Sequence, residues 1–422
     1  MSDKTNSKSA IGRIGRHKMS LPVMSFCALM LLLLSAGKGS VVAAESSEMV
    51  PVDGSAKSCR LIEIAPDWQL TFQTPGEKIE MSANDLVRWG RPVEPTHGPV
   101  VVLRDGSFLI ARLIAISAKE LTLDSRLFGR IAIPIRLVRG VVFQRTGDRP
   151  WVDVLNARDY DAKKPVLGDR ILLANGDWLT GLASEIQAGR IRMLGRLGEV
   201  RPSLTQIAAL WFNRQNTVAE ASDVDETSAQ LSAWVGLVDG SRLLADSILL
   251  DSDWLTIRAA GQTLETLSDD ICWLRPVGGR AVSLTSISPV GFRHLPYLSI
   301  SETFRIDRNV QRGTIRAGEK IYARGIGVPT TSRLTYSLDG TFRRFDTQVG
   351  IDAAARGRGS ARFRVYVDGL PVYTSPIVRG TDSPVSISVP IEGAKRIDLI
   401  TDFADLADQQ DYANWLDPRL VK

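Results

Sequence analysis

An acidic, amide-rich segment near the end of the 422-residue chain holds the side chains best suited to binding chemistry. Its four aspartates recur every third residue, at positions 402, 405, 408 and 411. Ca²⁺ takes six to eight oxygen ligands, which carboxylates and loop carbonyls supply, although this spacing is not that of an EF-hand. Two alternatives follow: a solvated acidic loop, or a structural Ca²⁺ site on Asp402, Asp405, Asp408 and Asp411.

Aromatic side chains stand beside these acids. Sugar binding, if it occurs here, needs an exposed aromatic face and a few fixed polar groups. Trp415 closes the segment and could either fill a β core, which we favour, or stack on a sugar, whereas Tyr412 is the better candidate for a contact. The candidate carbohydrate-binding residues are Tyr412, Asn414, Trp415, Asp411, Arg364 and Asp368.

The residues that catalysis usually requires are sparse. Outside the N-terminal 44 residues the only histidines are His97 and His294, far apart in sequence, which disfavours a histidine-based zinc site or a Ser-His-Asp triad. The chain also lacks the strand-helix alternation of most sugar-cleaving barrels. Residues 356–359, Arg-Gly-Arg-Gly, have no helix after them and are expected to form a hairpin tip. We predict that the protein is not an enzyme.

The first 44 residues predict a secretory signal. Basic residues precede an apolar run at 21–34, and Val42-Ala43-Ala44 offers a small-residue cleavage site; a retained membrane anchor is the alternative. Without this segment the chain has 46 basic and 46 acidic residues, so its overall charge of +5 lies in the leader. Nucleic acid is therefore not expected as a partner. Cys59 and Cys272 remain after export, either as a disulfide or as two separate buried thiols.

A strand-turn-strand motif repeats along the first two thirds of the chain. The turn glycines Gly106, Gly176 and Gly240 lie 70 and 64 residues apart. Each is followed by further strands, the last one apolar, and a partial copy lies upstream at residues 70–89. Units of about 45 residues and four or five strands have the size of small SH3-like or Sm-like barrels and should pack on their neighbours. The closing strands carry recurring tryptophans, for which core packing is favoured over sugar stacking: Trp89, Trp211 and Trp273.

The last third of the chain shows the period-two alternation of β-strands. Strands are expected at 342–352, 361–367, 385–391 and 396–402, and the Asp368-Gly369 pair after the second indicates a tight hairpin. Several short strands at regular spacing, with turn signals between them, are typical of a β-sandwich or jelly roll.

Three blocks in this region, in this order and spacing, resemble the NPCBM family of carbohydrate-binding modules attached to family-98 and other glycoside hydrolases. The blocks are Gly325–Val328, the run from Phe345 through Val349–Asp352 and Phe363–Val365 to Asp368–Gly369, and Asp411–Trp415. The resemblance covers roughly residues 295–420 and implies a sugar-binding β-sandwich. Family members often have His where Pro329 stands here, and His and Asp where Tyr412 and Asn414 stand.

Together these patterns predict an exported all-β protein of tandem SH3-like or Sm-like barrel repeats followed by a C-terminal jelly-roll-like β-sandwich. The expected parts are a signal peptide (1–44), a partial repeat (45–95), three repeats (96–146, 168–214 and 233–277) and the sandwich (290–422). The expected function is non-catalytic binding of a glycan or polysaccharide. The alternative is a secreted structural or protein-interaction scaffold. A co-exported hydrolase or another cell-envelope protein would be a further partner.

Overall fold

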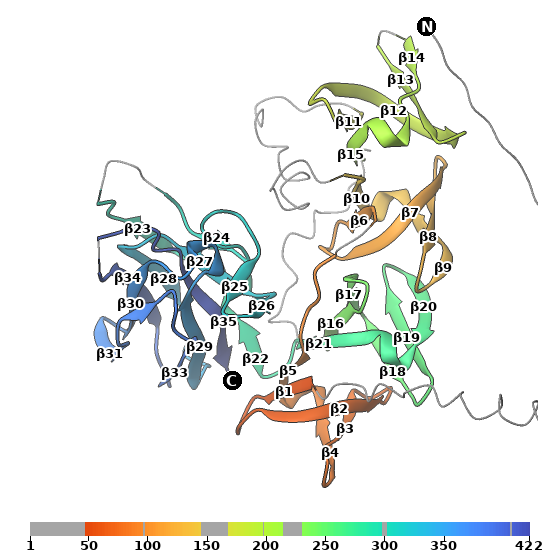
Figure 1. Ribbon diagram of the computed structural model, residues 1–422. Coiled ribbons are helices and arrows are strands. Elements are labelled where there is room, and N and C mark those ends of the chain that lie inside the picture. Colours follow the sequence, from red (N-terminus) through yellow and green to blue (C-terminus); the bar gives the residue numbers. More distant parts are fainter. Residues whose placement is uncertain are drawn as a thin grey trace, which may run out of the picture. The chain divides into compact units, whose positions relative to one another are not determined.

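The computed structural model describes residues 47–95, 98–144, 168–196, 198–213, 230–297, 302–405 and 407–422. These residues form strands joined by turns and short 3₁₀ helices, which confirms the predicted all-β class (Figure 1). Within them, no helix has the length and apolar character needed to cross a membrane. The predicted signal segment, His97 and residues 145–167 and 214–229, which connect the second, third and fourth units, lie outside the described residues.

The most N-terminal unit is a complete repeat, although the sequence predicts only a partial one. The strand β1 lies upstream of residues 70–89, where the sequence indicates the partial copy, and Met49 on it is buried in the core. Strand β1 pairs with β2 on one side and β5 on the other. The elements are β1 (Ser47–Pro51), β2 (Lys57–Ile64), β3 (Gln69–Gln73), β4 (Lys78–Ser82), η1 (Ala83–Asp85) and β5 (Leu86–Gly90).

The next three units follow the same order, with a 3₁₀ turn before each closing strand. The second unit contains β6 (Val100–Leu103), β7 (Phe108–Ile116), β8 (Glu120–Ser125), β9 (Gly129–Pro134), η2 (Ile135–Leu137) and β10 (Val138–Val142). The third contains β11 (Asp169–Leu173), β12 (Trp178–Gln187), β13 (Arg190–Gly195), β14 (Gly198–Val200), η4 (Leu204–Gln206) and β15 (Ile207–Trp211). The fourth contains β16 (Ser232–Leu237), β17 (Arg242–Ala245), β18 (Ser247–Leu250), β19 (Trp254–Ala259), β20 (Gln262–Leu267), η5 (Ser268–Asp270) and β21 (Ile271–Val277).

The repeat is also visible at atomic level in its first turn. The three turn glycines have φ near +90°, which glycine adopts without steric cost. In each turn a side-chain oxygen of the residue before the glycine accepts the backbone N–H of the residue after the glycine. Asp105 accepts from Ser107, Asn175 from Asp177, and Asp239 from Ser241. The polar turn residues therefore shape the same loop in three units.

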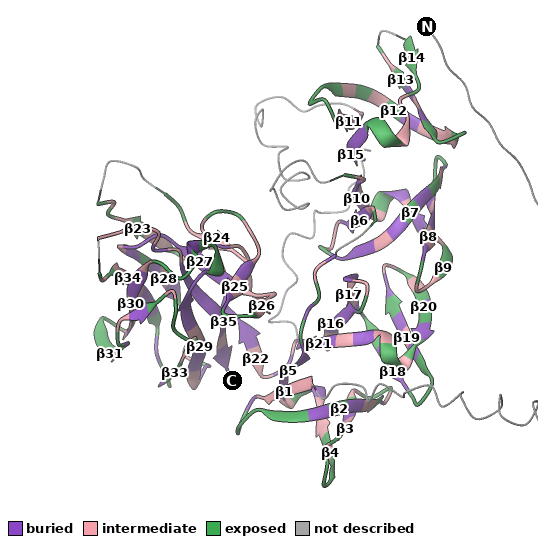
Figure 2. Cartoon of the chain, viewed as in Figure 1, coloured by how far each residue is buried: buried purple, intermediate pink, exposed green. Residues whose placement is uncertain are grey.

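Units are joined by strand pairing and by a continuous apolar core, as expected from the small size of each unit. Closing strands pair across units, β10 with β15 and β21 with β5. The second and fourth units make a reciprocal contact: the buried hydroxyl of Ser107 accepts the N–H of Leu244 at 2.8 Å, and that of Ser241 accepts the N–H of Ile110 at 2.9 Å. Figure 2 shows the buried residues along these strands.

The three closing-strand tryptophans and the two cysteines of the repeats pack inside the structure. Trp89, Trp211 and Trp273 are buried, which confirms the expected core role. Cys59 and Cys272 are free thiols, so of the two alternatives the structure shows separate cysteines. Burial raises the pKa of Cys59 to about 11 and that of Cys272 to about 12, so neither is a thiolate at neutral pH.

The C-terminal region is a two-layered antiparallel sandwich. One layer contains β24 (Arg305–Ile306), β27 (Gly325–Val328), β35 (Ala413–Val421), β29 (Arg344–Ile351) and β33 (Val385–Pro390), with β22 (Ala281–Ser283) beside β35. The other contains β23 (Gly291–His294), β28 (Ser332–Ser337), β34 (Arg396–Phe403), β30 (Ser360–Val367) and β31 (Leu370–Thr374), with β32 (Val378–Arg379) beside β30. The remaining elements are the hairpin of β25 (Ile315–Ala317) and β26 (Lys320–Tyr322), and the turns η6 (Leu284–Ser286) and η7 (Ala353–Ala355).

Three details of the sandwich differ from the sequence prediction. The acidic loop is followed by the nine-residue strand β35, which lies between β27 and β29. The strand β22 pairs with β35, so the layer includes residues before the predicted boundary at 290. Residues 356–359 connect the two layers after η7 and form no hairpin tip; Arg356 there has a φ of 53°.

The indole of Trp415 joins the two layers. Its side chain is completely buried between Phe345 of its own layer and Phe363 of the other, with the rings of Phe363 and Trp415 5.3 Å apart edge-on. Its Nε1–H donates to the hydroxyl of Thr401 on β34 at 3.0 Å. The polar edge of the indole is thus satisfied inside the core, as burial of tryptophan requires.

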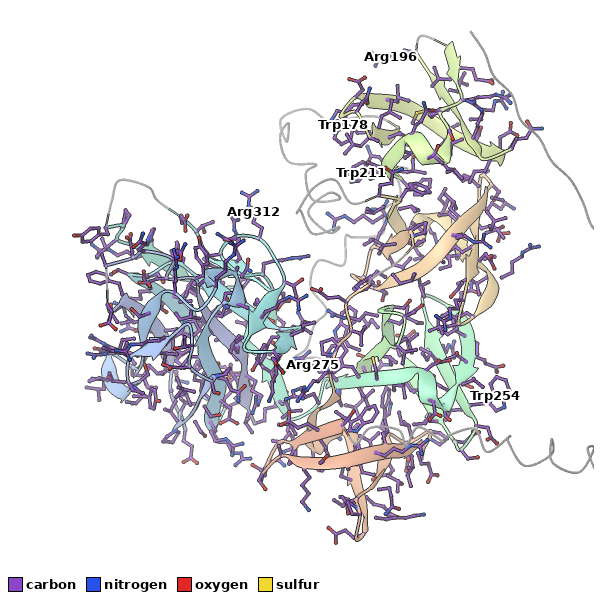
Figure 3. The ribbon with its side chains drawn as sticks, viewed as in Figure 1. Trp178, Arg196, Trp211, Trp254, Arg275 and Arg312 are labelled. Atoms are coloured by element: carbon purple, nitrogen blue, oxygen red, sulfur yellow. The ribbon has the colours of Figure 1, made fainter. Side chains whose placement is uncertain are left out.

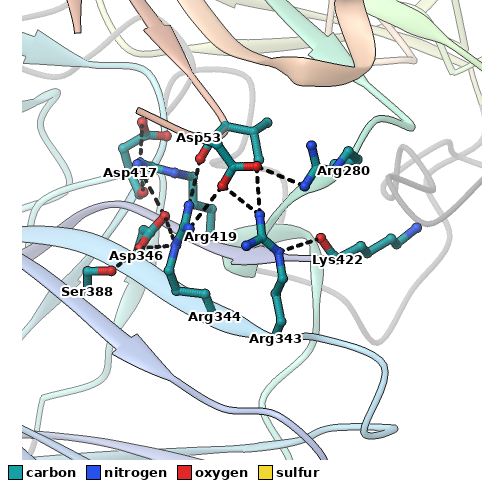
Figure 4. A network of polar contacts seen from close by, with 10 residues as sticks. Asp53, Arg280, Arg343, Arg344, Asp346, Ser388, Asp417, Arg419 and Lys422 are labelled. Carbon is teal, nitrogen blue, oxygen red and sulfur yellow. Dashed lines mark hydrogen bonds and ion pairs between the residues drawn. The ribbon is translucent and has the colours of Figure 1, made fainter. Parts of the chain in front are cut away.

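A cluster of arginines around Asp53 joins the first repeat to the sandwich (Figure 4). Arg343 contacts both carboxylate oxygens of Asp53, at 2.6 and 2.8 Å, and Arg280 and Arg344 also bind it, at 2.9 and 3.1 Å. These bonds, that of Arg343 above all, lower the pKa of Asp53 to about 2. A lowered pKa means that Asp53 contributes stability above the ordinary carboxyl range, and that this contribution is lost as the pH falls toward 2.

We expect Trp415→Ala to destabilise the sandwich by about 3–5 kcal/mol, because the change leaves a large cavity and an unpaired Thr401 hydroxyl. Denaturant unfolding measures the loss. Trp254→Ala is the matched control, since Trp254 on β19 is 54% exposed and should change stability by less than about 1 kcal/mol (Figure 3). Equal losses in the two variants would contradict the central role of Trp415.

Candidate functional site

One end of the sandwich brings together residues from three connections between strands, and Asp411 lies among them. The Asp411 carboxylate is buried and accepts the backbone N–H of Ser360 at 2.6 Å. Its second oxygen accepts the hydroxyl of Thr330 at 3.4 Å. Ser360 in turn receives the backbone N–H of Asp405 on its hydroxyl at 2.7 Å. These contacts fasten the acidic loop to the starts of β28 and β30.

Asp411 is poised to hold a proton near neutral pH. Burial raises its pKa to about 7, and the charges of Asp408 and Asp405 add to the rise, against the hydrogen bonds from Ser360 and Thr330. A carboxyl with such a pKa changes charge within the physiological range.

A second buried carboxylate, Asp352, organises the same end. It accepts side-chain N–H groups from Asn309 and Asn414, each at 2.9 Å, and the backbone N–H of Arg316 at 3.1 Å. This joins the loop after β24, the end of β29 and the start of β35. Asn414 is completely buried, and its Oδ1 has no hydrogen-bond partner among the described residues.

The predicted sugar-binding residues divide into three groups. Asp411, Tyr412, Asn414 and Trp415 lie together at this end. Trp415 and Asn414 are fully buried and present no face to a ligand, so the core role is the one the structure shows for Trp415. Tyr412 is half-buried and packs against the core.

The other two predicted residues lie elsewhere on the sandwich. Arg364 is on the outer face of β30 and pairs with Asp402 at 3.1 Å. Asp368 has a φ of 48° in the hairpin turn after β30, where its carboxylate accepts the N–H groups of Lys395 and Arg396. Eight strand residues separate this turn from Ser360, roughly 25 Å. Asp368 is therefore at the far end, away from Asp411.

His294 lies at the same end as Asp411, with both ring nitrogens occupied. The backbone N–H of Glu302 donates to its Nδ1 at 3.1 Å, so Nε2 carries the proton and faces the carbonyl of Thr330 at 2.9 Å. The imidazole is held as a structural link between β23 and the turn after β27, and it is not placed as a general base.

The sandwich region is similar in sequence to a known family of domains. The family model described as NPCBM/NEW2 domain matches residues 293–421, which contain most of the sandwich. Residues 293–421 are an NPCBM/NEW2 domain. This confirms the resemblance drawn from the three sequence blocks.

Relatives with known names match this part of the chain. A protein of Renibacterium salmoninarum named as an endo-alpha-N-acetylgalactosaminidase is 28% identical over 107 residues, which are 25% of this chain and 7% of that protein. Alpha-1,3-galactosidase B of Akkermansia muciniphila is 30% identical over 117 residues, which are 27% of this chain and 15% of that enzyme. The chain thus spans less than a fifth of either relative. A solved CBM51 module from Clostridium perfringens GH95, in complex with methyl-galactose, is 25% identical and covers 33% of this chain and 99% of its own, with a TM-score of 0.31.

An exposed aromatic pair at this end of the NPCBM domain was missed in the sequence. Tyr297, 63% exposed, and Phe403, 41% exposed, have ring centroids 6.0 Å apart and meet edge-on. Phe403 has the parity of the inward-facing Thr401, but β34 extends beyond the core at this point. Period-two alternation indicates on which face of the sheet a residue lies. It does not indicate whether the core extends far enough to cover that residue, and at Phe403 the core does not.

Three of the four aspartates of the predicted Ca²⁺ site have separate partners in the NPCBM domain. Asp402 pairs with Arg364, Asp405 pairs with Arg379 at 2.8 Å, and Asp411 is held by Ser360. Over the described ranges, no three His, Cys, Asp or Glu side chains are grouped so as to hold a metal ion. Ca²⁺ binding by Asp402, Asp405, Asp408 and Asp411 stays a prediction.

The titration of Asp411 should appear in the stability of the protein. A folded pKa of about 7, against an ordinary 3.8, means that the folded state holds a proton that the unfolded state has released. The contribution of Asp411 to the free energy of unfolding should therefore be greatest below pH 4 and should decrease as the pH rises to 7.

We expect Asp411→Asn to remove this decline, so that the variant gains stability over wild type at pH 8 but not at pH 4. Melting temperatures across that range measure it. Glu392→Gln, at an exposed carboxyl without a described partner, should keep the wild-type slope. Parallel pH profiles for Asp411→Asn and wild type would contradict the assignment.

Proposed function

We propose that the protein is exported and binds glycans without cleaving them, through the NPCBM domain. The observation that carries this proposal is the family match over residues 293–421. Both named relatives are glycosidases, and each matches this chain only over a part of about the size of the domain. The shared part is thus a module common to sugar-processing proteins, and no share of their catalytic activity is transferred with it.

The end of the sandwich supplies the chemistry that sugar binding needs. Tyr297 and Phe403 offer exposed aromatic surface to the apolar face of a pyranose ring. The ion pair of Asp405 and Arg379 is half-exposed and close by, because Arg379 pairs in the sheet with Ser360 and Phe403 with Ala361. Its donors and acceptors can bind sugar hydroxyls. Tyr412 and Asp411 stand behind this edge.

Export rests on the basic and apolar pattern of residues 1–44. An exported protein meets the polysaccharides outside the cell, which agrees with a glycan ligand. Sequencing the N-terminus of the secreted protein tests it, and a mature chain that begins at Glu45 is the expected result.

A protein-interaction role for the repeats is the second candidate function, and it is compatible with glycan binding. Leu249, Trp254 and Leu267 project from one face of the β18–β19–β20 sheet and are all exposed. Apolar side chains gathered on one outer face are typical of a surface that contacts another macromolecule.

We expect the full chain to bind galactose- or N-acetylgalactosamine-containing glycans on an array, because both named relatives act on such sugars by their names. Tyr297→Ala, Phe403→Ala and Tyr412→Ala should each weaken binding about tenfold, the effect of losing one stacking or packing contact of 1–2 kcal/mol.

Leu370→Ala is the matched control, since Leu370 is 70% exposed at the opposite end of the sandwich. Silence on the array, with an unchanged circular dichroism spectrum, would overturn glycan binding and leave the interaction role. Equal weakening by Leu370→Ala would show that the sugar sits elsewhere.

A further inference from the structure

The first turn of the third repeat is exposed, whereas those of the other units contact another part of the chain. The turns of the second and fourth units meet each other through the hydroxyls of Ser107 and Ser241. The turn of the first unit carries Asp53, whose carboxylate binds arginines of the sandwich. In the third unit residues 174–178 are all exposed, and no described residue of another unit bonds to this turn.

The contact between the second and fourth units has an approximate two-fold symmetry. Phe108 and Arg242, each two residues after its turn glycine, oppose each other in a β-bridge. The serine after each glycine accepts the backbone N–H of the residue four positions after the other glycine. Equivalent residues thus meet each other, which is the isologous geometry that two identical subunits adopt across a two-fold axis.

The third unit presents the same strand edge. The N–H of Leu173 donates to the carbonyl of Asp177 at 2.9 Å, as the equivalent residues do in the second and fourth units. Because the residue pairs of an antiparallel ladder alternate, the N–H groups of Trp178 and Thr180 point away from β11. Strand β12 pairs with β11 and, from Leu182 onward, with β13, so no strand of the described chain pairs with the outer side of this stretch.

Trp178 makes this edge apolar. Its side chain is 39% exposed, whereas Phe108, at the same position of the second unit, is 6% exposed. The indole is held by Trp211, with ring centroids 5.1 Å apart, and by the guanidinium of Arg170, 4.1 Å from its ring centroid (Figure 3). Residues 178–181 carry neither a charge nor a proline, two features that often protect an edge strand from pairing.

A second difference distinguishes the third unit. In the second and fourth units the positions six and eighteen residues after the turn glycine are charged: Arg112, Asp124, Asp246 and Arg258. In the third unit both are leucines, Leu182 and Leu194, which pair across β12 and β13 and are 48% and 53% exposed. These positions border the contact between units, because burial raises the pKa of Asp105 in the second unit and the charge of Asp246 in the fourth adds to the rise. The leucines therefore extend the apolar edge.

We propose that the third unit binds the third unit of a second copy of this chain, with Trp178 opposite the partner's Trp178 as Phe108 is opposite Arg242. Asp177 takes the place of the serine and accepts the N–H of the partner's Thr180, since a carboxylate accepts such a bond as a hydroxyl does. Cross-strand aromatic pairs stabilise a ladder, and the two-fold axis closes the assembly at a dimer. This contact lies in the repeats and does not depend on glycan binding.

Sedimentation velocity tests the dimer in the chain from residue 45, at concentrations up to about 100 µM. We expect a reversible dimer with a micromolar Kd, because the paired stretch is short. Trp178→Lys should weaken association at least about tenfold, since it places a charge on the edge. Leu182→Arg/Leu194→Asp, which introduces the ion pair of the second unit and keeps Trp178, should weaken it about tenfold. Circular dichroism checks that the variants are folded.

Trp254→Lys is the matched control, because Trp254 is 54% exposed on the other apolar face, that of the fourth unit. It should leave the dimer unchanged. A wild type that stays monomeric would overturn the proposal, as would equal weakening by Trp178→Lys and Trp254→Lys. Weakening by Trp254→Lys alone would place the dimer contact on the β18–β19–β20 face and would also overturn it.

Trp178→Cys tests the two-fold register. Opposed residues of an antiparallel pair have Cα atoms about 5.5 Å apart, within the range of a disulfide. Oxidation with diamide should link two copies through the introduced thiols, whereas Trp254→Cys should stay unlinked. The raised pKa values of Cys59 and Cys272 keep these thiols protonated and poorly reactive. Equal cross-linking of the two variants would contradict the pairing of Trp178 with its own counterpart.

Discussion

The antiparallel ladder of the last strand, β35, is the constraint on which the sandwich depends. This strand pairs with β27 on one side and β29 on the other, and its far end pairs with β22. It also carries Trp415, whose indole crosses to Thr401 in the opposite layer. Because the strand is central, neither the layer nor the core is complete before the last residues of the chain are in place. The buried residues around Asp352 are organised by the same strand, through Asn414.

Each repeat is too small to have an adequate core of its own, so the repeats depend on contacts with one another. Their closing strands pair with the closing strands of other units, and the buried hydroxyls of Ser107 and Ser241 satisfy backbone donors across the boundary. The turn that creates each contact is the same turn that defines the repeat. The serine whose backbone N–H binds the turn aspartate is thus also the residue whose hydroxyl accepts a backbone N–H of the other unit.

The exposed surface at one end of the sandwich has the chemistry that the proposed glycan site needs. At the end of the sandwich, Tyr297 and Phe403 present aromatic surface backed by satisfied polar groups, an arrangement suited to neutral, hydroxyl-rich ligands. At the junction of the first repeat with the sandwich, charge has a structural purpose, because Arg343 and Arg280 both bind the carboxylate of Asp53.

The all-β class, the repeated turn and most strands of the sandwich follow from the sequence by itself, because alternation and turn chemistry act over a few residues. The Asp368-Gly369 hairpin and the buried closing tryptophans were predictable for this reason. Tertiary structure alone decided that β1 and β35 are strands, that Phe403 passes beyond the core, and that Asp411 is enclosed by Ser360 and Thr330. Each of these depends on where a layer ends and which distant segment covers it, and no local period of the sequence carries that information.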